Sequence, residues 1–131
     1  MMNILVGYDG SNACKEALKV AIAHAKAFGG RIHLVASMAK GTADEHLEIK
    51  DMEDQLDENK RLVEKSSVQC ETHLLIRGLM PGEDLVEYAK EKDVEEIVMG
   101  IRRRSKVGKL LFGSTAQYVI LNAPCPVVTV K

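Results

Sequence analysis

The chain has 131 residues, with 18 Lys and Arg side chains against 19 Asp and Glu, and no Trp. This length predicts a single domain over residues 1–131 that buries about two thirds of its extended surface. The net charge of −1 argues against a protein that coats nucleic acid or an anionic membrane with its whole surface.

The cysteines and the apolar runs indicate the compartment. Cys14, Cys70 and Cys125 are widely spaced, without a Cys-x-x-Cys pair, so we expect neither a disulfide framework nor a zinc site. No apolar run reaches the length of a membrane helix, and residues 1–6 do not resemble a secretory leader. We therefore expect a mature, soluble chain in the reducing cytoplasm.

The first third of the chain is predicted to form strand, helix and strand. Apolar residues over 4–8 predict a strand that ends at the turn 9–11. Helical spacing predicts a helix over 11–28, stopped by Gly29-Gly30, and a second strand over 32–37 follows. The expected buried face of the helix is formed by Cys14, Ala17, Leu18, Ala21, Ala25 and Phe28.

The middle of the chain continues this alternation. Residues 42–45 have the Thr-x-x-Glu form of a capping box and predict the start of a long, acidic second helix. Residues 70–76 alternate enough for a third strand. Pro81 fits the first turn of a third helix that runs to about Glu91.

The last third supplies the remaining elements, a strand over 95–100, a basic loop over 101–112, a helix over 113–122 and a strand over 126–130. Regular alternation predicts an α/β fold with right-handed crossovers. We expect one doubly wound, five-stranded parallel sheet with four helices on both faces.

Ligands of such a sheet bind at the carboxyl ends of the strands, where the strand order reverses. The Asp9-Gly10-Ser11 turn is expected at that edge. Gly113, Ser114 and Thr115 open the last helix, whose amides and dipole attract anions. This combination suits a phosphate, although a glycine and a serine at a helix start also serve as a simple cap.

A basic stretch precedes the last helix, and no acidic residue occurs between Ile101 and Thr115. Guanidinium and ammonium groups there would neutralise phosphate charge. The alternative is an ordinary solvated loop. The basic residues are Arg102, Arg103, Arg104, Lys106 and Lys109.

Catalytic arrangements are not evident. Asp9 is interpreted either as a ligand contact or as part of a turn or helix cap. The histidines show no paired spacing and are expected to be surface or packing residues; they are His24, His33, His46 and His73. ATP hydrolysis would require a base or a water-positioning group, and only Asp9 is placed to help.

Several segments together resemble the universal stress protein family. Gly100-Ile101-Arg102-Arg103, followed by nine residues and Gly113-Ser114, is similar to the Gly-x2-Gly-x9-Gly-Ser/Thr nucleotide signature of that family. The opening segment 4–11, the strand ending at Gly100 and the terminal segment 124–130 are also similar. The resemblance covers essentially the whole chain.

This resemblance implies the strand order 3-2-1-4-5 and a site for an adenine nucleotide, ATP or AMP, with or without Mg²⁺. Asp9 would lie near the adenine or a phosphate-bound cation, and the backbone near Ala36 and Ser37 would recognise adenine. Met99 and Gly100 would flank the ribose. The phosphates would lie against residues 113–115, with Gly10, Ser11, Arg102 and Arg103 nearby.

One position departs from the family pattern, because Arg103 replaces the middle glycine. An arginine side chain could reach the phosphate or fill the site. The leading hypothesis is a nucleotide-binding regulatory or stress-response protein. Alternatives are a dimeric interaction module that has lost nucleotide, a slow ATPase, and a nucleic-acid binder that uses the basic loop.

The last strand suggests a partner. Residues Val127–Val130 are expected at a sheet edge with unpaired amides. In the family, such a strand pairs with its twin from another subunit, so we expect a homodimer through this strand. A short, unpaired edge is the alternative.

Overall fold

Strands and helices alternate along the chain, as the sequence predicts. The computed structural model describes residues 1–39, 45–101, 103–104, 110–111 and 113–131. In chain order the elements are β1 (Met2–Gly7), α1 (Asn12–Phe28), β2 (Gly30–Ser37), α2 (Glu45–Lys65), β3 (Cys70–Leu75), α3 (Pro81–Glu91), β4 (Glu96–Gly100), β5 (Arg103–Arg104), β6 (Leu110–Leu111), α4 (Ser114–Asn122) and β7 (Val127–Val130).

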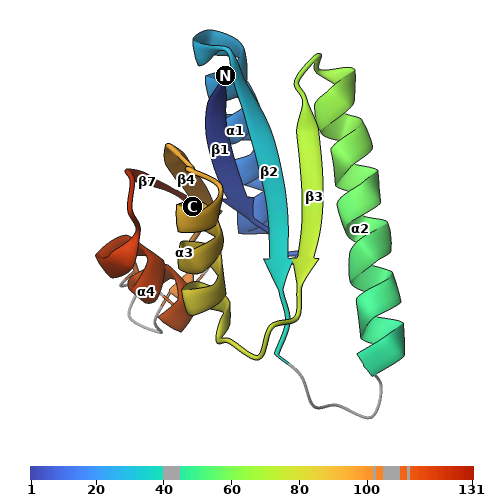
Figure 1. Cartoon of the computed structure of the whole chain (residues 1–131), viewed down its shortest axis with the longest axis vertical. Coiled ribbons are helices and arrows are strands. Elements are labelled where there is room, and N and C mark those ends of the chain that lie inside the picture. The colour runs from blue at the N-terminus through green and yellow to red at the C-terminus, as the bar shows by residue number, and fades with distance from the viewer. Residues whose placement is uncertain (40–44, 102, 105–109, 112) are drawn as a thin grey trace.

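The main sheet has five parallel strands in the order β3-β2-β1-β4-β7, which confirms the expected order 3-2-1-4-5. Leu5 of β1 lies opposite His33 of β2 on one side and Ile97 of β4 on the other. The chain moves outward from β1 in both directions, so the strand order reverses between β1 and β4. The carboxyl ends of the strands lie at the lower edge in Figure 1.

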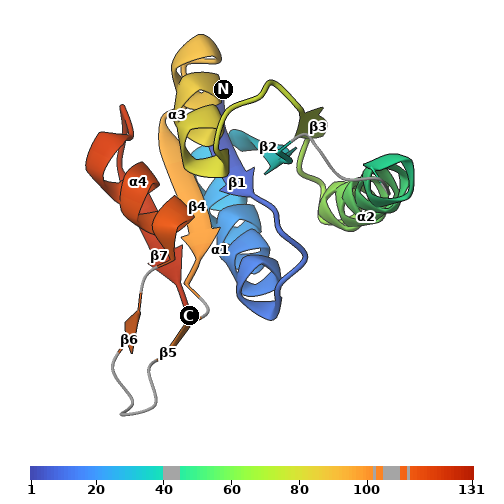
Figure 2. The same cartoon turned by 90° about the horizontal axis from the view of Figure 1, so that it is seen from below.

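Two helices cover each face of this sheet (Figures 1 and 2). The first apolar cluster joins the sheet to α1 and α2, and the second joins it to α3 and α4. Successive side chains of a strand point to opposite faces. Ile4 therefore belongs to the first cluster and Leu5 to the second, and both are fully buried. Burial on both faces explains the continuous apolar run Ile4-Leu5-Val6 within β1.

Two features differ from the sequence-based expectation. Within the predicted loop 101–112, β5 and β6 form a short antiparallel pair with Arg103 opposite Leu111, and this pair lies beyond the end of the sheet (Figure 2). Phe28 is 65% exposed. It sits at the last residue of α1, where it makes an edge contact with His24. The predicted capping residues 42–44 lie outside the described residues.

Candidate nucleotide site

A pocket of 280 Å³ lies at the carboxyl ends of β1 and β4, close to the lower size limit of small-molecule sites. It is at the strand reversal, where the fold class places ligands. The predicted site residues that line it are Asp9, Ser37, Met99, Gly100, Gly113, Ser114 and Thr115. Segments widely separated in the sequence therefore meet at one site.

The turn after β1 is shaped by Gly10 and Ser11. Gly10 has a φ of 79°, a backbone conformation that side chains disfavour. The Ser11 amide donates to Asp9 Oδ1 over 2.9 Å, and Ser11 Oγ accepts from the Cys14 amide over 3.2 Å, which caps α1. Asp9 thus forms part of the turn and also lines the pocket, while Gly10 and Ser11 hold the turn in place.

The start of α4 forms another wall of the pocket. Gly113 is the N-cap residue, with a φ of −67° and no side-chain hydrogen bond to the helix. The first amides of any α-helix lack intrahelical acceptors, and Ser114, Thr115 and Ala116 all line the pocket. A Cβ added to Gly113 would meet no described atom within 4 Å. Neither backbone conformation nor described packing therefore demands glycine here.

The packing of α1 against β4 explains why position 100 is a glycine. A Cβ added to Gly100 would lie 2.5 Å from the carbonyl carbon of Ala13 and 2.7 Å from its Cβ. The sheet and helix backbones approach so closely that no side chain fits. Gly100 therefore has a structural role in addition to lining the pocket.

Three other predicted site residues, Ala36, Arg102 and Arg103, are not among the described residues that line the pocket. Ala36 is 1% exposed in the cluster beneath α1, and its neighbours Val35 and Ser37 line the pocket instead. Arg103 lies in β5. Arg102 falls outside the described residues.

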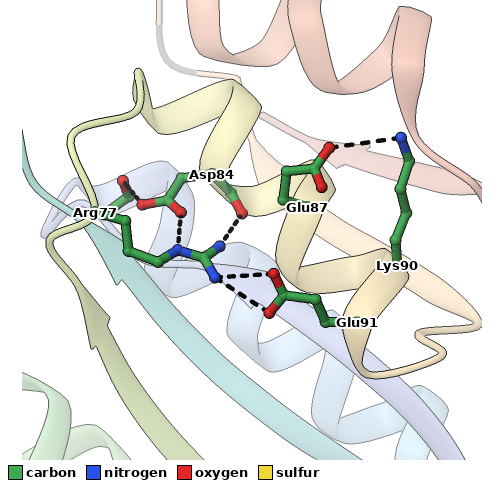
Figure 3. Close-up of polar contacts among 6 residues, drawn as sticks. Arg77, Asp84, Glu87, Lys90 and Glu91 are labelled. Atoms are coloured by element: carbon green, nitrogen blue, oxygen red, sulfur yellow. Dashed lines mark hydrogen bonds and ion pairs between the residues drawn. The ribbon is translucent and has the colours of Figure 1, made fainter.

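A buried ionic network supports the wall formed by β2 and α3 (Figure 3). The Ser37 hydroxyl donates to Asp84 Oδ2 over 2.7 Å, and Arg77 Nε donates to Asp84 Oδ1 over 2.6 Å. Asp84 is fully buried. Arg77 also donates to both carboxylate oxygens of Glu91, at 3.0 and 3.1 Å. The network therefore fixes the end of β2 against α3 beside the pocket.

Two further side chains that line the pocket, Tyr8 and Cys14, are buried and hydrogen-bonded. The Tyr8 hydroxyl donates to Gln55 Oε1 over 2.9 Å and accepts from Asn59 Nδ2 over 3.3 Å, so the end of β1 is joined to α2. Burial raises the pKa of the Cys14 thiol, and its Sγ donates to the Ser11 carbonyl over 3.1 Å. Cys14 is therefore a buried packing residue whose thiol loses its proton less readily than a free cysteine.

Comparison with known proteins identifies the fold. The model of the universal stress protein family matches residues 1–131. The chain belongs to this family. A universal stress protein of Thermus aquaticus is 35% identical over 98% of this chain and 97% of its own length. One from Methanocaldococcus jannaschii is 34% identical over 98% of this chain and 81% of its own.

Solved structures of universal stress proteins have the same fold as this chain. One from Archaeoglobus fulgidus is 36% identical and superposes with a TM-score of 0.91, covering 100% of this chain and 99% of its own. A structure from the same organism in complex with dAMP is 34% identical, with a TM-score of 0.84 and coverage of 100% and 98%. Adenine nucleotides are thus bound within the universal stress protein family.

Sequence reasoning missed the Asp84 network of this universal stress protein. Arg77 and Asp84 are separated by seven residues across a loop and a helix start, and nothing in their spacing indicates contact. A signal was present, because Asp84 lies in the first turn of an amphipathic helix, on its buried face and next to the apolar Leu85. A carboxylate at such a position requires a partner.

Proposed function

We propose that the pocket binds an adenine nucleotide, ATP or AMP, and that the chain acts as a small cytoplasmic regulatory or stress-response module of one domain over residues 1–131. The observation that carries the proposal is Gly113-Ser114-Thr115 opening a helix at the pocket. The dAMP complex of the Archaeoglobus fulgidus protein, 34% identical to this chain, supports the choice of an adenine nucleotide.

The phosphates are proposed to lie at the start of α4. The Ser114 and Thr115 amides and hydroxyls would donate to phosphate oxygens, and the helix dipole favours negative charge there. Gly113 leaves room for the phosphate, because no described atom lies within 4 Å of its Cβ position. This would explain a glycine that packing does not require.

The nucleoside is proposed to occupy the part of the pocket between the strand ends. Met99 and Gly100 would flank the ribose. Val35, Leu85 and Pro81 supply apolar surface for the adenine, and the Ala36–Ser37 backbone would recognise its edge. The Ser37 hydroxyl already donates to Asp84, so the backbone groups carry this recognition.

Among the described residues that line the pocket, Asp9 supplies the carboxylate. Carboxylates and phosphate oxygens are typical ligands of Mg²⁺, so Asp9 would hold a phosphate-bound Mg²⁺ when ATP is present. The ion would reduce repulsion between the carboxylate and the phosphates. Binding of ATP should therefore depend on Mg²⁺ more strongly than binding of AMP.

Isothermal titration of the full chain with ATP and AMP, with and without Mg²⁺, tests the proposal. We expect saturable binding of one nucleotide per chain. Ser114→Ala removes a donor to a charged group and should weaken binding at least about tenfold. The matched Ser66→Ala, which lies after α2, should leave it unchanged. No binding at millimolar nucleotide, or equal effects of the two variants, would contradict the proposal.

An interaction module is the second candidate, because α4 exposes large apolar side chains beside the edge strand β7. Tyr118 is 39%, Ile120 42% and Leu121 81% exposed. We propose a homodimer through β7, with or without nucleotide. Arg103→Gly separates the two candidates: a gain in nucleotide affinity would indicate that Arg103 fills the site, and a loss that it contacts phosphate.

ATP hydrolysis is a further candidate function, and it can be measured with the same purified chain. A slow ATPase would use Asp9, so Asp9→Asn should abolish product formation while nucleotide still binds. Turnover unaffected by this change would exclude the mechanism. Nucleic-acid binding by the basic residues Arg102, Arg103 and Arg104 would instead show a steep salt dependence.

A further inference from the structure

Three side chains on the α3 side of the sheet converge away from the nucleotide pocket. His33 of β2 is paired in register with Glu71 of β3, and Val35 with His73. Glu71 and His73 are two residues apart on one strand, so both point to the face that His33 occupies. One donor atom from each of the three lies within 4.8 Å of the others.

The distances suit a metal ion. His33 Nδ1 lies 3.3 Å from Glu71 Oε2, and His73 Nε2 lies 3.9 Å from the same oxygen. Zinc bonds of about 2.0–2.2 Å at tetrahedral angles separate neighbouring ligand atoms by about 3.3–3.6 Å. Glu71 and His73 are 53% and 40% exposed, so their side chains can make the small adjustment required.

The hydrogen bonds around His33 determine which nitrogen is available. Arg31 Nε donates to Asn3 Oδ1 over 2.7 Å, which identifies that atom as an acceptor. His33 Nε2 lies 3.2 Å from the same Oδ1, so Nε2 carries the proton. In neutral His33 the lone pair is therefore on Nδ1, which faces Glu71.

The His33 side chain is buried, and this burial lowers its pKa. The Nδ1 lone pair accepts from the Tyr88 hydroxyl over 2.9 Å and faces the Glu71 carboxylate. Metal binding at Nδ1 would replace this hydrogen bond and require the Tyr88 oxygen to move away from Nδ1. A cation between Nδ1 and Glu71 would remove the repulsion between the lone pair and the carboxylate.

His73 gives independent evidence. Its Nε2 is buried and has no hydrogen-bond partner among the described residues, although buried polar atoms are nearly always partnered. The ring lies against Tyr88, with centroids 5.4 Å apart. An unpartnered nitrogen oriented toward a carboxylate and a second imidazole is what an unfilled coordination site would leave.

We propose that His33 Nδ1, Glu71 and His73 Nε2 bind a divalent transition-metal ion of the Zn²⁺ class. Two imidazoles and a carboxylate suit Zn²⁺, Co²⁺, Ni²⁺ or Cu²⁺ better than Mg²⁺ or Ca²⁺. The Nε2–H bond from His33 to Asn3 supplies the outer-shell partner that orients metal-bound histidines. Three protein ligands leave a fourth coordination position for a water molecule.

The site is distinct from the nucleotide pocket. His33 precedes Ser37, the pocket residue on the same strand, by four residues, or about 13 Å along the strand. None of the three ligands lines the pocket. This face of β2 and β3 lies beside α3, on the side opposite α2 (Figure 1), and the side chains of Glu71 and His73 are partly exposed there.

The test is a titration of chelator-treated, tag-free full chain with Zn²⁺, followed by Co²⁺ spectroscopy. We expect one Zn²⁺ per chain and a Co²⁺ spectrum without thiolate charge-transfer bands, which excludes the cysteines as ligands. His73→Gln and Glu71→Gln should each weaken Zn²⁺ binding by more than the roughly 10- to 100-fold typical of outer-shell changes.

His24→Gln is the matched control. His24 Nδ1 contacts the Glu96 carboxylate at 2.7 Å, so this variant removes a histidine from a different histidine–carboxylate pair. It should leave Zn²⁺ affinity unchanged. Absence of saturable binding by the wild type, thiolate bands with Co²⁺, or equal losses in His73→Gln and His24→Gln would each overturn the proposal. Unchanged metal-free melting temperatures establish that the variants are folded.

Discussion

Gly100 of β4 lies directly beneath Ala13 of α1, with its Cβ position 2.5 Å from the Ala13 carbonyl carbon. The contact is between two backbones, which cannot move aside as a flexible side chain can. We predict that Gly100→Ala destabilises the fold by about 3 kcal/mol, at the upper end of overpacking costs. Urea denaturation measures this change.

Gly113→Ala is the matched variant for this pair of glycines. The added Cβ has no described neighbour within 4 Å, and the φ of −67° suits any residue. Stability should change by less than about 1 kcal/mol, whereas nucleotide affinity should fall because the methyl group occupies the proposed phosphate position. Equal stability losses in the two variants would contradict the distinction between a packing glycine and a ligand glycine.

The buried Asp84 carboxylate gives a second prediction. Asp84→Ala leaves the Ser37 hydroxyl and Arg77 without their shared partner. We expect a loss of about 3 kcal/mol, at the low end for a broken buried ion pair, because Arg77 is 32% exposed and keeps Glu91. Thermal and urea unfolding measure the loss.

The control for Asp84 lies on the same helix (Figure 3). Glu87 pairs with Lys90 at 3.6 Å, and both side chains are about half exposed. Glu87→Ala should therefore change stability by less than about 0.5 kcal/mol. A similar loss in both variants would contradict a specific contribution of the buried network, because alanine has a higher helix propensity than either acidic residue.

Stability should fall in alkaline solution. Burial raises the pKa of Cys70 from 9.0 to about 12 and that of Tyr88 from 10.0 to about 12. Above pH 9 the unfolded chain releases the thiol proton that the native protein keeps. The native state then binds more protons, so its stability decreases as pH rises, by up to about 1.4 kcal/mol per pH unit for each group.

Urea denaturation at stepwise pH checks this alkaline loss. The decline should begin near pH 9, steepen above pH 10 as Tyr88 contributes, and level near pH 12. Cys70→Ala should be less stable at neutral pH because of its cavity, yet its stability should decline less between pH 9 and 10. An unaltered slope in this variant would contradict the assignment to Cys70.

The proposed dimer predicts a specific effect of proline in β7. Pro126 and Val130 carbonyls accept from β4, so the alternate residue Thr129 directs its backbone amide away from β4. Thr129→Pro removes this outward donor and should yield a monomer, while β7 keeps its bonds to β4. Light scattering at tens of micromolar measures the mass. Thr129→Val should remain dimeric, and a monomeric wild type would refute the proposed dimer.

The fold was predictable from sequence because alternating elements and the glycine turns constrain it locally. The helix over 81–91 begins at Pro81 and ends as predicted, since its signals lie within the segment itself. Phe28 shows the limit of this reasoning: helical period places it beside Ala25, but its position at the end of α1 leaves it mostly exposed. The β5–β6 pair is too short for its period to be recognised.

The sequence predicted that Asp9 and Gly113 lie at the edge of the sheet where the pocket is found, because each of these loops carries its own signal. The residues of the proposed metal site were not predictable, because strand register brings them together. His33 and His73 show no paired spacing along the chain, yet pairing of β2 with β3 places them around Glu71. Gly100 could be recognised as special, although its contact with Ala13 depends on how α1 crosses the sheet.

The hydroxyl of Tyr8 has a consequence for the acidic helix. It is bonded to Gln55 and Asn59 of α2, while its own residue lines the pocket. A ligand that displaces the end of β1 must either carry α2 with it or break these bonds. The acidic helix α2 is therefore joined to the wall of the pocket through the hydrogen bonds of one hydroxyl group.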